Sequence, residues 1–106
     1  MRLWGLYIAE REGADIIYND DGFVTFKMEE DGLYVIDVFV VKEKRRTGAV
    51  QELWDSLIEK TKPKIVYGMT DVAALNWENS HAFMVKFGFT PYSQEENTIY
   101  YYREIL

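Results

Sequence analysis

One segment constrains the fold more than any other: a long apolar run that leads through a basic loop into an amphipathic helix. The run Leu33–Val41 is apolar on both faces apart from Asp37, which is typical of a strand in the middle of a sheet. After the loop, apolar residues recur at helical spacing, namely Val50, Leu53, Trp54, Leu57 and Ile58. Pro63 ends this helix, and Lys64–Met69 follows as a second strand. We therefore expect two parallel neighbouring strands, joined by a right-handed crossover through the helix at 48–61.

The remaining segments complete a mixed sheet of the α/β (α+β) class. Helical spacing at 3–11 predicts a first helix. Alternation and turn signals predict four more strands, at Ile16–Tyr18, Phe23–Met28, Phe89–Tyr92 and Thr98–Glu104. A second crossover helix is expected to begin near Asn76 or Asn79 and to end at Gly88. Its inward residues are expected to be Phe83, Met84 and Phe87. All 106 residues are interpreted as one domain with the order α-β-β-β-α-β-α-β-β.

The composition excludes several kinds of site. The chain has no cysteine, which excludes disulfides, thiolate metal ligands and cysteine nucleophiles. His81 is the only histidine, so we expect no metal site and interpret His81 as a solvated helix residue. The formal net charge of −6 disfavours a nucleic-acid partner and mildly favours an amine or a lysine-bearing protein.

The targeting signals of exported and membrane proteins are not visible in the sequence. Residues 1–10 lack the pattern of a signal peptide, and no apolar run approaches the length of a bilayer span. We therefore expect a cytoplasmic protein that has no membrane contact. The sequence leaves a homodimer open.

The loop between the apolar run and the helix combines the features of an anion-binding site. Arg45 and Arg46 supply positive charge, and Gly48 lets the backbone approach a ligand closely. The first turn of the following helix presents unpaired N–H groups. These features predict that residues 45–50 hold a phosphate group. The alternative is an ordinary strand-to-helix turn with solvated charges, and the loop by itself does not decide between them.

Two strings in the sequence resemble the GNAT N-acetyltransferases. The first, at 38–59, is VFVVKEKRRTGAVQELWDSLIE, and it is similar to the segment that binds the pyrophosphate of acetyl-CoA through an Arg-x-x-Gly-x-Gly/Ala loop. The second, at 79–89, is NSHAFMVKFGF, and it is similar to the family's later helix, which ends in a Gly-Phe pair. One strand lies between them, as in the family. The short N-terminal region resembles compact phage or bacterial members.

The resemblance implies a site for acetyl-CoA as a cosubstrate. The two central strands would part at their C-terminal ends and hold the pantetheine arm in the gap. Backbone groups would pair with that arm at Phe39, Val40 and Val41. The diphosphate would be held by Arg45, Arg46, Thr47, Gly48, Ala49 and Val50. Asn76 or Asn79 would reach the pantetheine, although the family's usual asparagine falls nearest Trp77.

The sequence departs from the family pattern at two positions. Val50 stands where the loop commonly has Gly or Ala, so its side chain either hinders the phosphate or turns inward to the apolar stripe. Met84 stands where many members have a tyrosine that protonates the leaving thiolate, and a thioether cannot donate a proton. Tyr67 or Tyr101 is a candidate substitute.

Asp37 is the candidate general base. On a regular strand it shares one face with Val35 and Phe39, and a carboxylate desolvated by such neighbours becomes a better proton acceptor. The alternative is a structural carboxylate bonded to neighbouring backbone. The implied activity is therefore N-acetylation of a primary amine on a small molecule or protein. The alternative function is a catalytically degenerate GNAT-like module that binds CoA or another protein.

Overall fold

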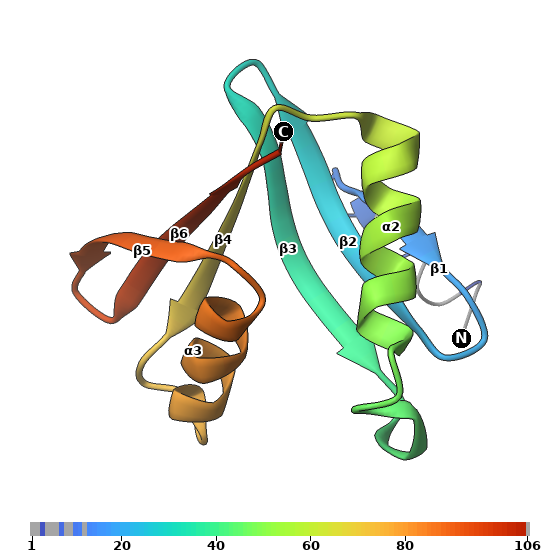
Figure 1. Ribbon diagram of the computed structural model, residues 1–106. Coiled ribbons are helices and arrows are strands. Elements are labelled where there is room, and N and C mark those ends of the chain that lie inside the picture. The colour runs from blue at the N-terminus through green and yellow to red at the C-terminus, as the bar shows by residue number, and fades with distance from the viewer. Residues whose placement is uncertain (1–2, 4–6, 8–9, 12, 106) are drawn as a thin grey trace.

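Six strands form one mixed sheet, and α2 and α3 pack on the same face of it (Figure 1). The computed structural model describes Leu3, Tyr7, Glu10, Arg11 and residues 13–105. The elements in chain order are β1 (Asp15–Tyr18), β2 (Gly22–Glu29), β3 (Gly32–Val40), the short 3-10 helix η1 (Lys42–Lys44), α2 (Ala49–Thr61), β4 (Ile65–Asp71), α3 (Trp77–Lys86), β5 (Thr90–Glu95) and β6 (Thr98–Glu104). The strands lie in the order β1-β2-β3-β4-β6-β5, and every neighbouring pair is antiparallel except β3 and β4.

The observed order of elements differs from the predicted order by one additional element. The sequence did not predict η1. The predicted helix at 3–11 falls largely outside the described residues, although those of its residues that are described have helical backbone. From β1 onward, the predicted strands and crossover helices all occur, with bounds that differ by a few residues.

α2 covers β1 and β2 with the apolar stripe that the sequence predicted. Leu53 and Leu57 are buried. The other stripe residues, Val50, Trp54 and Ile58, are partly buried against the same core. Burying a leucine side chain stabilises the fold by about 1.5–3 kcal/mol. Because a helix of this length is marginal on its own, packing rather than propensity holds α2 in place.

α3 ends in a Schellman motif at Gly88. Gly88 has a φ of 93°, and the following residue, Phe89, donates its N–H to the carbonyl of Met84 at 3.0 Å. Glycine adopts this left-handed conformation without strain, so the predicted helix end is confirmed. Met84 and Phe87 are half-buried as expected. Phe83 also faces the groove between the helices and stacks on Phe87, but its side chain remains 41 % exposed.

β3 carries a β-bulge at Ile36. Thr25 of β2 faces Asp37, but the next residue of β2, Phe26, faces Val35. Ile36 is therefore an extra residue in β3, and an extra residue reverses the alternation of side chains beyond it.

The bulge changes which side chains share a face of β3. Val35 and Val38 both lie on the face covered by the helices, whereas Asp37 and Phe39 lie on the opposite face. The expectation that Asp37 shares a face with Val35 and is buried there is therefore wrong. The side chain of Asp37 is exposed, and its N–H donates to Thr25 Oγ1 at 3.0 Å.

β3 and β4 are parallel neighbours only where they begin. Leu33 pairs with Val66 and Tyr34 pairs with Tyr67, and no further pair follows in the described residues although β3 continues to Val40. Figure 1 shows the two strands diverging toward their C-terminal ends. Parallel central strands that part were expected, and the pairing confirms them.

The parting of the strands also explains why the middle of β3 is exposed. The three hydrophobic residues Ile36, Val38 and Phe39 are 37–46 % exposed, although their run is apolar on both faces. Once β4 diverges, β2 is the one strand neighbour of this part of β3 among the described residues.

Candidate functional site

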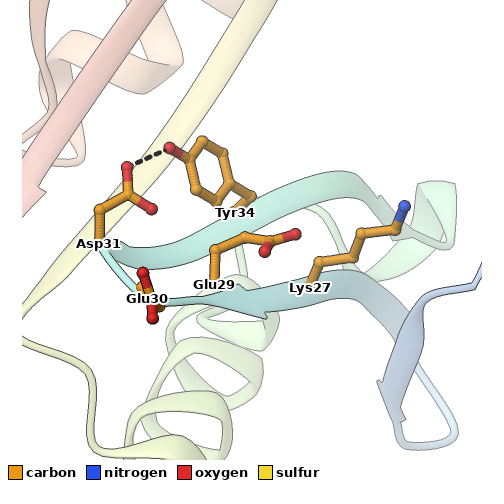
Figure 2. Close-up of a pocket in the computed structure, with 5 residues that line it drawn as sticks. All are labelled: Lys27, Glu29, Glu30, Asp31 and Tyr34. Atoms are coloured by element: carbon orange, nitrogen blue, oxygen red, sulfur yellow. Dashed lines mark hydrogen bonds between the residues drawn. The ribbon is translucent and has the colours of Figure 1, made fainter.

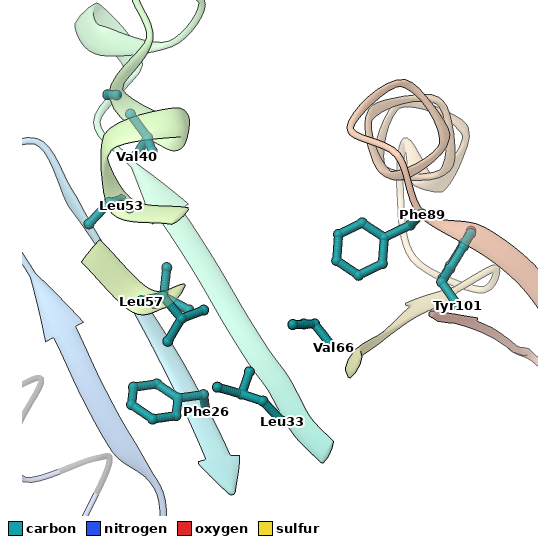
Figure 3. Packing of buried hydrophobic residues seen from close by; sticks show 10 residues of the cluster. Phe26, Leu33, Val40, Leu53, Leu57, Val66, Phe89 and Tyr101 are labelled. Carbon is teal, nitrogen blue, oxygen red and sulfur yellow. The ribbon is translucent and has the colours of Figure 1, made fainter. Parts of the chain in front are cut away.

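A hydrophobic groove opens between α2 and α3 where β3 and β4 part. Its lining consists of apolar side chains from both helices and from the sheet, namely Val24, Val35, Val38, Val50, Trp54, Leu57, Phe83, Met84, Phe87 and Phe89. Figure 3 shows Leu33 and Leu57 on one side of the gap, Phe89 and Tyr101 on the other, and Val66 between them. The groove reaches the first turn of α2, because Val50 lies in that turn.

The edge of β3 supplies the polar groups that the groove side chains lack. Beyond Tyr34, β3 has no strand partner on its β4 side in the part of the chain that the structure describes. Such an edge pairs readily with an extended chain. Val41 is less suited to this pairing, because its N–H already donates to Asp21 at 2.8 Å and its carbonyl accepts from Lys44 at 2.9 Å.

The N-terminus of α2 is open to an anion. Gly48 occupies the N-cap position with a φ of 91°, and no side chain caps the helix. A Cβ added at Gly48 would meet no atom within 4 Å, so the space above the first turn is free. Ala49 follows and is buried against the core, which anchors this turn. The N–H groups of the first turn and the positive end of the helix dipole therefore face open space.

The basic loop places its charges beside that helix end. Arg45 Nε donates to the carbonyl of Val40 at 2.9 Å, and its guanidinium lies 5.8 Å from the ring centroid of Phe39. The side chain is therefore fixed against the end of β3. Arg46 is exposed, and the hydroxyl of Thr47, also exposed, bonds to the carbonyl of Lys44.

The two candidate asparagines lie at the start of α3. Asn76 is the N-cap residue and has a φ of 62°, but its side chain makes no capping hydrogen bond. Asn79 lies inside the helix, one turn before Phe83 of the groove. Residues four apart share a helix face, so Asn79 lies on the same face of α3 as Phe83. Both side chains are exposed.

Val50 and Met84, which depart from the family pattern, both line the groove. Val50 is half-buried against the core, so its side chain turns inward to the apolar stripe of α2, which was one of the two expected orientations. Met84 lies over Gly68 of β4, since a Cβ added at Gly68 would come within 2.6 Å of the Met84 methyl carbon. A thioether, which cannot donate a proton, therefore lines the groove beside β4.

The two candidate tyrosines lie on opposite faces of the sheet. Tyr101 is fully buried beneath α3, and its hydroxyl lies 2.6 Å from Nδ1 of His81. Tyr67 is half-buried on the other face, where it stacks on Tyr34. The register between β4 and β6 causes this difference, because Tyr101 faces Gly68 and not Tyr67. The interpretation of His81 as a solvated residue is wrong.

The sequence did not single out an acidic hollow beside the β2–β3 hairpin. Its volume is about 750 Å³, and it is lined by Lys27, Glu29, Glu30, Asp31 and Tyr34 (Figure 2). The Tyr34 hydroxyl donates to Asp31 Oδ2 at 2.6 Å, and this hydrogen bond raises the pKa of Tyr34 to about 12. The acidic residues in the turn before Tyr34 are visible in the sequence, but nothing in their spacing shows that one of them bonds to the Tyr34 hydroxyl.

Two other features bear on the class of protein. Among the described residues, no three histidine, cysteine or acidic side chains are grouped closely enough to hold a metal ion. No helix in the described part of the chain is long and apolar enough to cross a membrane.

Known proteins resemble this chain in structure, but none matches it significantly in the sequence comparisons. No protein-family model matches the chain, and no curated protein sequence matches it significantly. The PaiA N-acetyltransferase of Thermoplasma acidophilum, solved with coenzyme A, superposes with a TM-score of 0.70 at 12 % identity, over 97 % of this chain and 69 % of that one. An acetyltransferase of Bacillus cereus has a TM-score of 0.63 at 15 % identity, over 99 % of this chain and 94 % of that one.

A third likeness is to a GNAT-family acetyltransferase of Staphylococcus aureus, with a TM-score of 0.65 at 16 % identity over 92 % of this chain and 73 % of that one. Some similar structures are longer: this chain spans only 61 % of a protein from Bacteroides thetaiotaomicron assigned to the same family. Identities this low carry the fold and not the activity. The parted parallel strands, the crossover helix and these superpositions show that the chain has the GNAT acetyltransferase fold.

Proposed function

We propose that the protein is an acetyl-CoA-dependent N-acetyltransferase acting on an amine. The observation that carries the proposal is the uncapped N-terminus of α2 at one end of the groove between β3 and β4. A diphosphate needs several N–H donors and positive charge, and the first turn of α2 with Arg45 and Arg46 supplies both. The open space above Gly48 fits this role.

The pantetheine arm would lie in the hydrophobic groove and pair with the free edge of β3 at Val40. The backbone of Phe39 is less suited to this pairing, because its carbonyl lies against Gly22 of β2. Asn79 would reach the arm from α3, with Asn76 as the second candidate. The groove encloses about 50 Å³ in this conformation, so the arm would have to displace side chains at its mouth. The half-exposed ring of Phe83 is the natural one to move.

In the proposed reaction the amine nitrogen attacks the thioester carbonyl, the C–S bond breaks, and the amine loses one proton while the thiolate gains one. A backbone N–H of β3 near Phe39 and Val40 would stabilise the oxyanion. Asp37 would accept the amine proton through water, since its exposed carboxylate lies on β3 beside the gap. The thiolate proton would come from Tyr67 or Tyr101.

A catalytically degenerate module that binds CoA is the second candidate function. Met84 favours it, because the groove side chain at the position of the family's acid cannot donate a proton. Tyr101 is enclosed beneath α3, and Tyr67 lies on the face opposite the groove. Each phenol would therefore have to reach the sulfur from outside the groove lining.

Two measurements test the proposed function. Acetyl-CoA should raise the unfolding temperature, since a ligand at a hundredfold excess over its Kd stabilises the folded state by about 2.7 kcal/mol. A thiol-release assay against a panel of amines then tests transfer, and the absence of cysteine leaves no protein background. Stabilisation without transfer to any amine would favour the degenerate module. No stabilisation at any concentration would contradict CoA binding.

A further inference from the structure

The face of the sheet opposite α2 and α3 carries a row of tyrosines. Tyr34, Tyr67 and Tyr102 are register partners across β3, β4 and β6. Tyr92 of β5 contacts two of them, with ring centroids 6.4 Å from Tyr67 and 5.8 Å from Tyr102. We call these four residues the tyrosine row. Three are half-buried and Tyr92 is 55 % exposed, so each ring offers surface to a ligand.

The acidic hollow adjoins one end of the tyrosine row. Tyr34 belongs to both, and its hydroxyl holds Asp31 at 2.6 Å (Figure 2). The hollow has three carboxylates, at Glu29, Glu30 and Asp31, against the single positive charge of Lys27, which leaves a net charge of −2. The whole chain carries −6, so this surface is negative within a negative molecule.

Aromatic faces and carboxylates favour the same kind of partner. The face of a tyrosine ring attracts a cation held over it, and Arg and Lys side chains do this most often. Carboxylates add charge-assisted hydrogen bonds to the same groups. An anionic or nucleic-acid partner would be repelled by the net charge of the hollow. The charge complementarity of this surface is therefore to a basic ligand.

The size of the surface favours a peptide over a small amine. The row crosses from β3 through β4 and β6 to β5, which is three strand spacings of about 4.8 Å or roughly 14 Å. An extended peptide rises about 3.3 Å per residue, so the row matches about four residues. A single ammonium group would contact only part of it.

We propose that the tyrosine row and the acidic hollow form a docking surface for a basic peptide segment. Tyr34 and Tyr67 are the last registered pair before β3 and β4 part, so a segment bound here lies beside the vertex of the gap. If the proposed function is correct, this segment carries the acceptor amine. Binding of the peptide does not depend on the proposed function, because it requires neither CoA nor turnover.

Binding of a fluorescein-labelled hexapeptide of alternating lysine and arginine, measured by anisotropy without CoA, tests the docking surface. The triple variant Glu29→Gln, Glu30→Gln, Asp31→Asn should weaken binding at least tenfold. The matched triple Glu52→Gln, Asp55→Asn, Glu59→Gln makes the same change of charge on the exposed side of α2 and should change binding less than twofold. Equal losses in the two triples would overturn the proposal, because they would indicate general charge attraction.

A pair of tyrosine variants tests the aromatic half of the surface. Tyr92→Ala should weaken peptide binding about fivefold or more, whereas Tyr18→Ala, on the 40 % exposed tyrosine of β1 outside the row, should not. Both should unfold at temperatures close to that of the parent, since neither side chain belongs to the buried core. Unchanged binding in Tyr92→Ala would overturn the role of the row.

Two further experiments distinguish a peptide ligand from a small polyamine, and peptide docking from CoA binding. Spermidine should compete with the labelled peptide only weakly, and competition as strong as that of unlabelled peptide would overturn the peptide assignment in favour of a small polyamine. If acetyl-CoA still stabilises the protein while the peptide does not bind, the docking surface fails and the proposed function does not. If the peptide binds while acetyl-CoA does not, the docking surface holds and only the acceptor role is lost.

Discussion

Tyr34 of β3 and Tyr67 of β4 are the last registered pair before the two parallel strands part, and their rings stack with centroids 4.8 Å apart. The pair therefore closes the vertex of the gap on one face of the sheet. Met84 lies over Gly68 near the same vertex on the other face. A cosubstrate in the groove and an acceptor on the tyrosine face would approach each other across this vertex.

The proposed phosphate role of the α2 N-terminus predicts that Gly48→Glu abolishes stabilisation by acetyl-CoA. The new carboxylate would stand in the open space above the first turn and repel the diphosphate. Gly13→Glu is the matched control, because Gly13 also has a positive φ of 70° and open space around its Cβ position. Both variants carry a similar backbone strain. A thermal shift retained in Gly48→Glu would show that this loop is not the phosphate site.

The proposed general base predicts that Asp37→Asn lowers turnover by about a hundredfold or more while acetyl-CoA binding is kept. Asparagine has the same shape but cannot accept the amine proton. Asp55→Asn, on the exposed side of α2, is the control for loss of one surface charge. Steady-state rates and calorimetry with acetyl-CoA measure the two effects. Equal turnover in Asp37→Asn and the parent would remove Asp37 from the mechanism.

The hydrogen bond between His81 and Tyr101 predicts a loss of stability in His81→Ala. The fully buried Tyr101 hydroxyl would lose its partner, at a cost of about 1–3 kcal/mol. In a Tyr101→Phe background the same substitution should cost less, because no hydroxyl remains to be satisfied. Urea unfolding of the parent, the two single variants and the double variant gives the coupling free energy between the two side chains. Additive effects would indicate that the pair contributes nothing beyond separate packing.

Much of the fold was predictable because its signals are local. The apolar stripe of α2 and the glycine at the end of α3 depend on neighbouring residues in the sequence, and both occur as expected. The parallel pairing of β3 and β4 follows from the crossover rule. The uncapped start of α2 at Gly48 is a local feature too, since a glycine before a helix with no capping side chain is readable from the sequence.

The site was less predictable because its geometry depends on register between strands. The bulge at Ile36 arises in the ladder with β2, and nothing in the alternation of β3 reveals it, so Asp37 was assigned to the wrong face. Register between β4 and β6 likewise decides that Tyr101 lies beneath α3 while Tyr67 lies on the far face. The bond from Tyr34 to Asp31 spans only three residues across a turn, and it was missed because the spacing of the turn residues does not show which side chains pair.

The pairing of Tyr34 with Asp31 predicts a phenol that ionises unusually late. The hydrogen bond to the carboxylate raises the pKa of Tyr34 from 10.0 to about 12, so folding favours the neutral phenol. Its stabilising contribution is complete below about pH 10 and is lost as the pH rises through 12. Asp31→Asn should lower the pKa of Tyr34 toward 10. A titration of tyrosine Cζ resonances by NMR, with Tyr34→Phe to assign the signal, measures the change, and an unshifted signal in the parent would contradict the pairing.

In the proposed transfer, the lack of a proton donor at Met84 should limit the rate. If a proton on the leaving thiolate is rate-limiting, Met84→Tyr should raise turnover with little change in acetyl-CoA affinity, because a phenol in the groove donates where a thioether cannot. Met84→Phe places a ring of nearly the same size there without a hydroxyl. This control distinguishes the effect of proton donation from the effect of the larger ring on packing, since any strain of the ring against Gly68 is common to both variants. Higher turnover in Met84→Tyr than in Met84→Phe identifies the hydroxyl as the cause. Equal turnover in the two would mean that another group, such as Tyr67 or Tyr101, already supplies the proton or that a different step limits the rate.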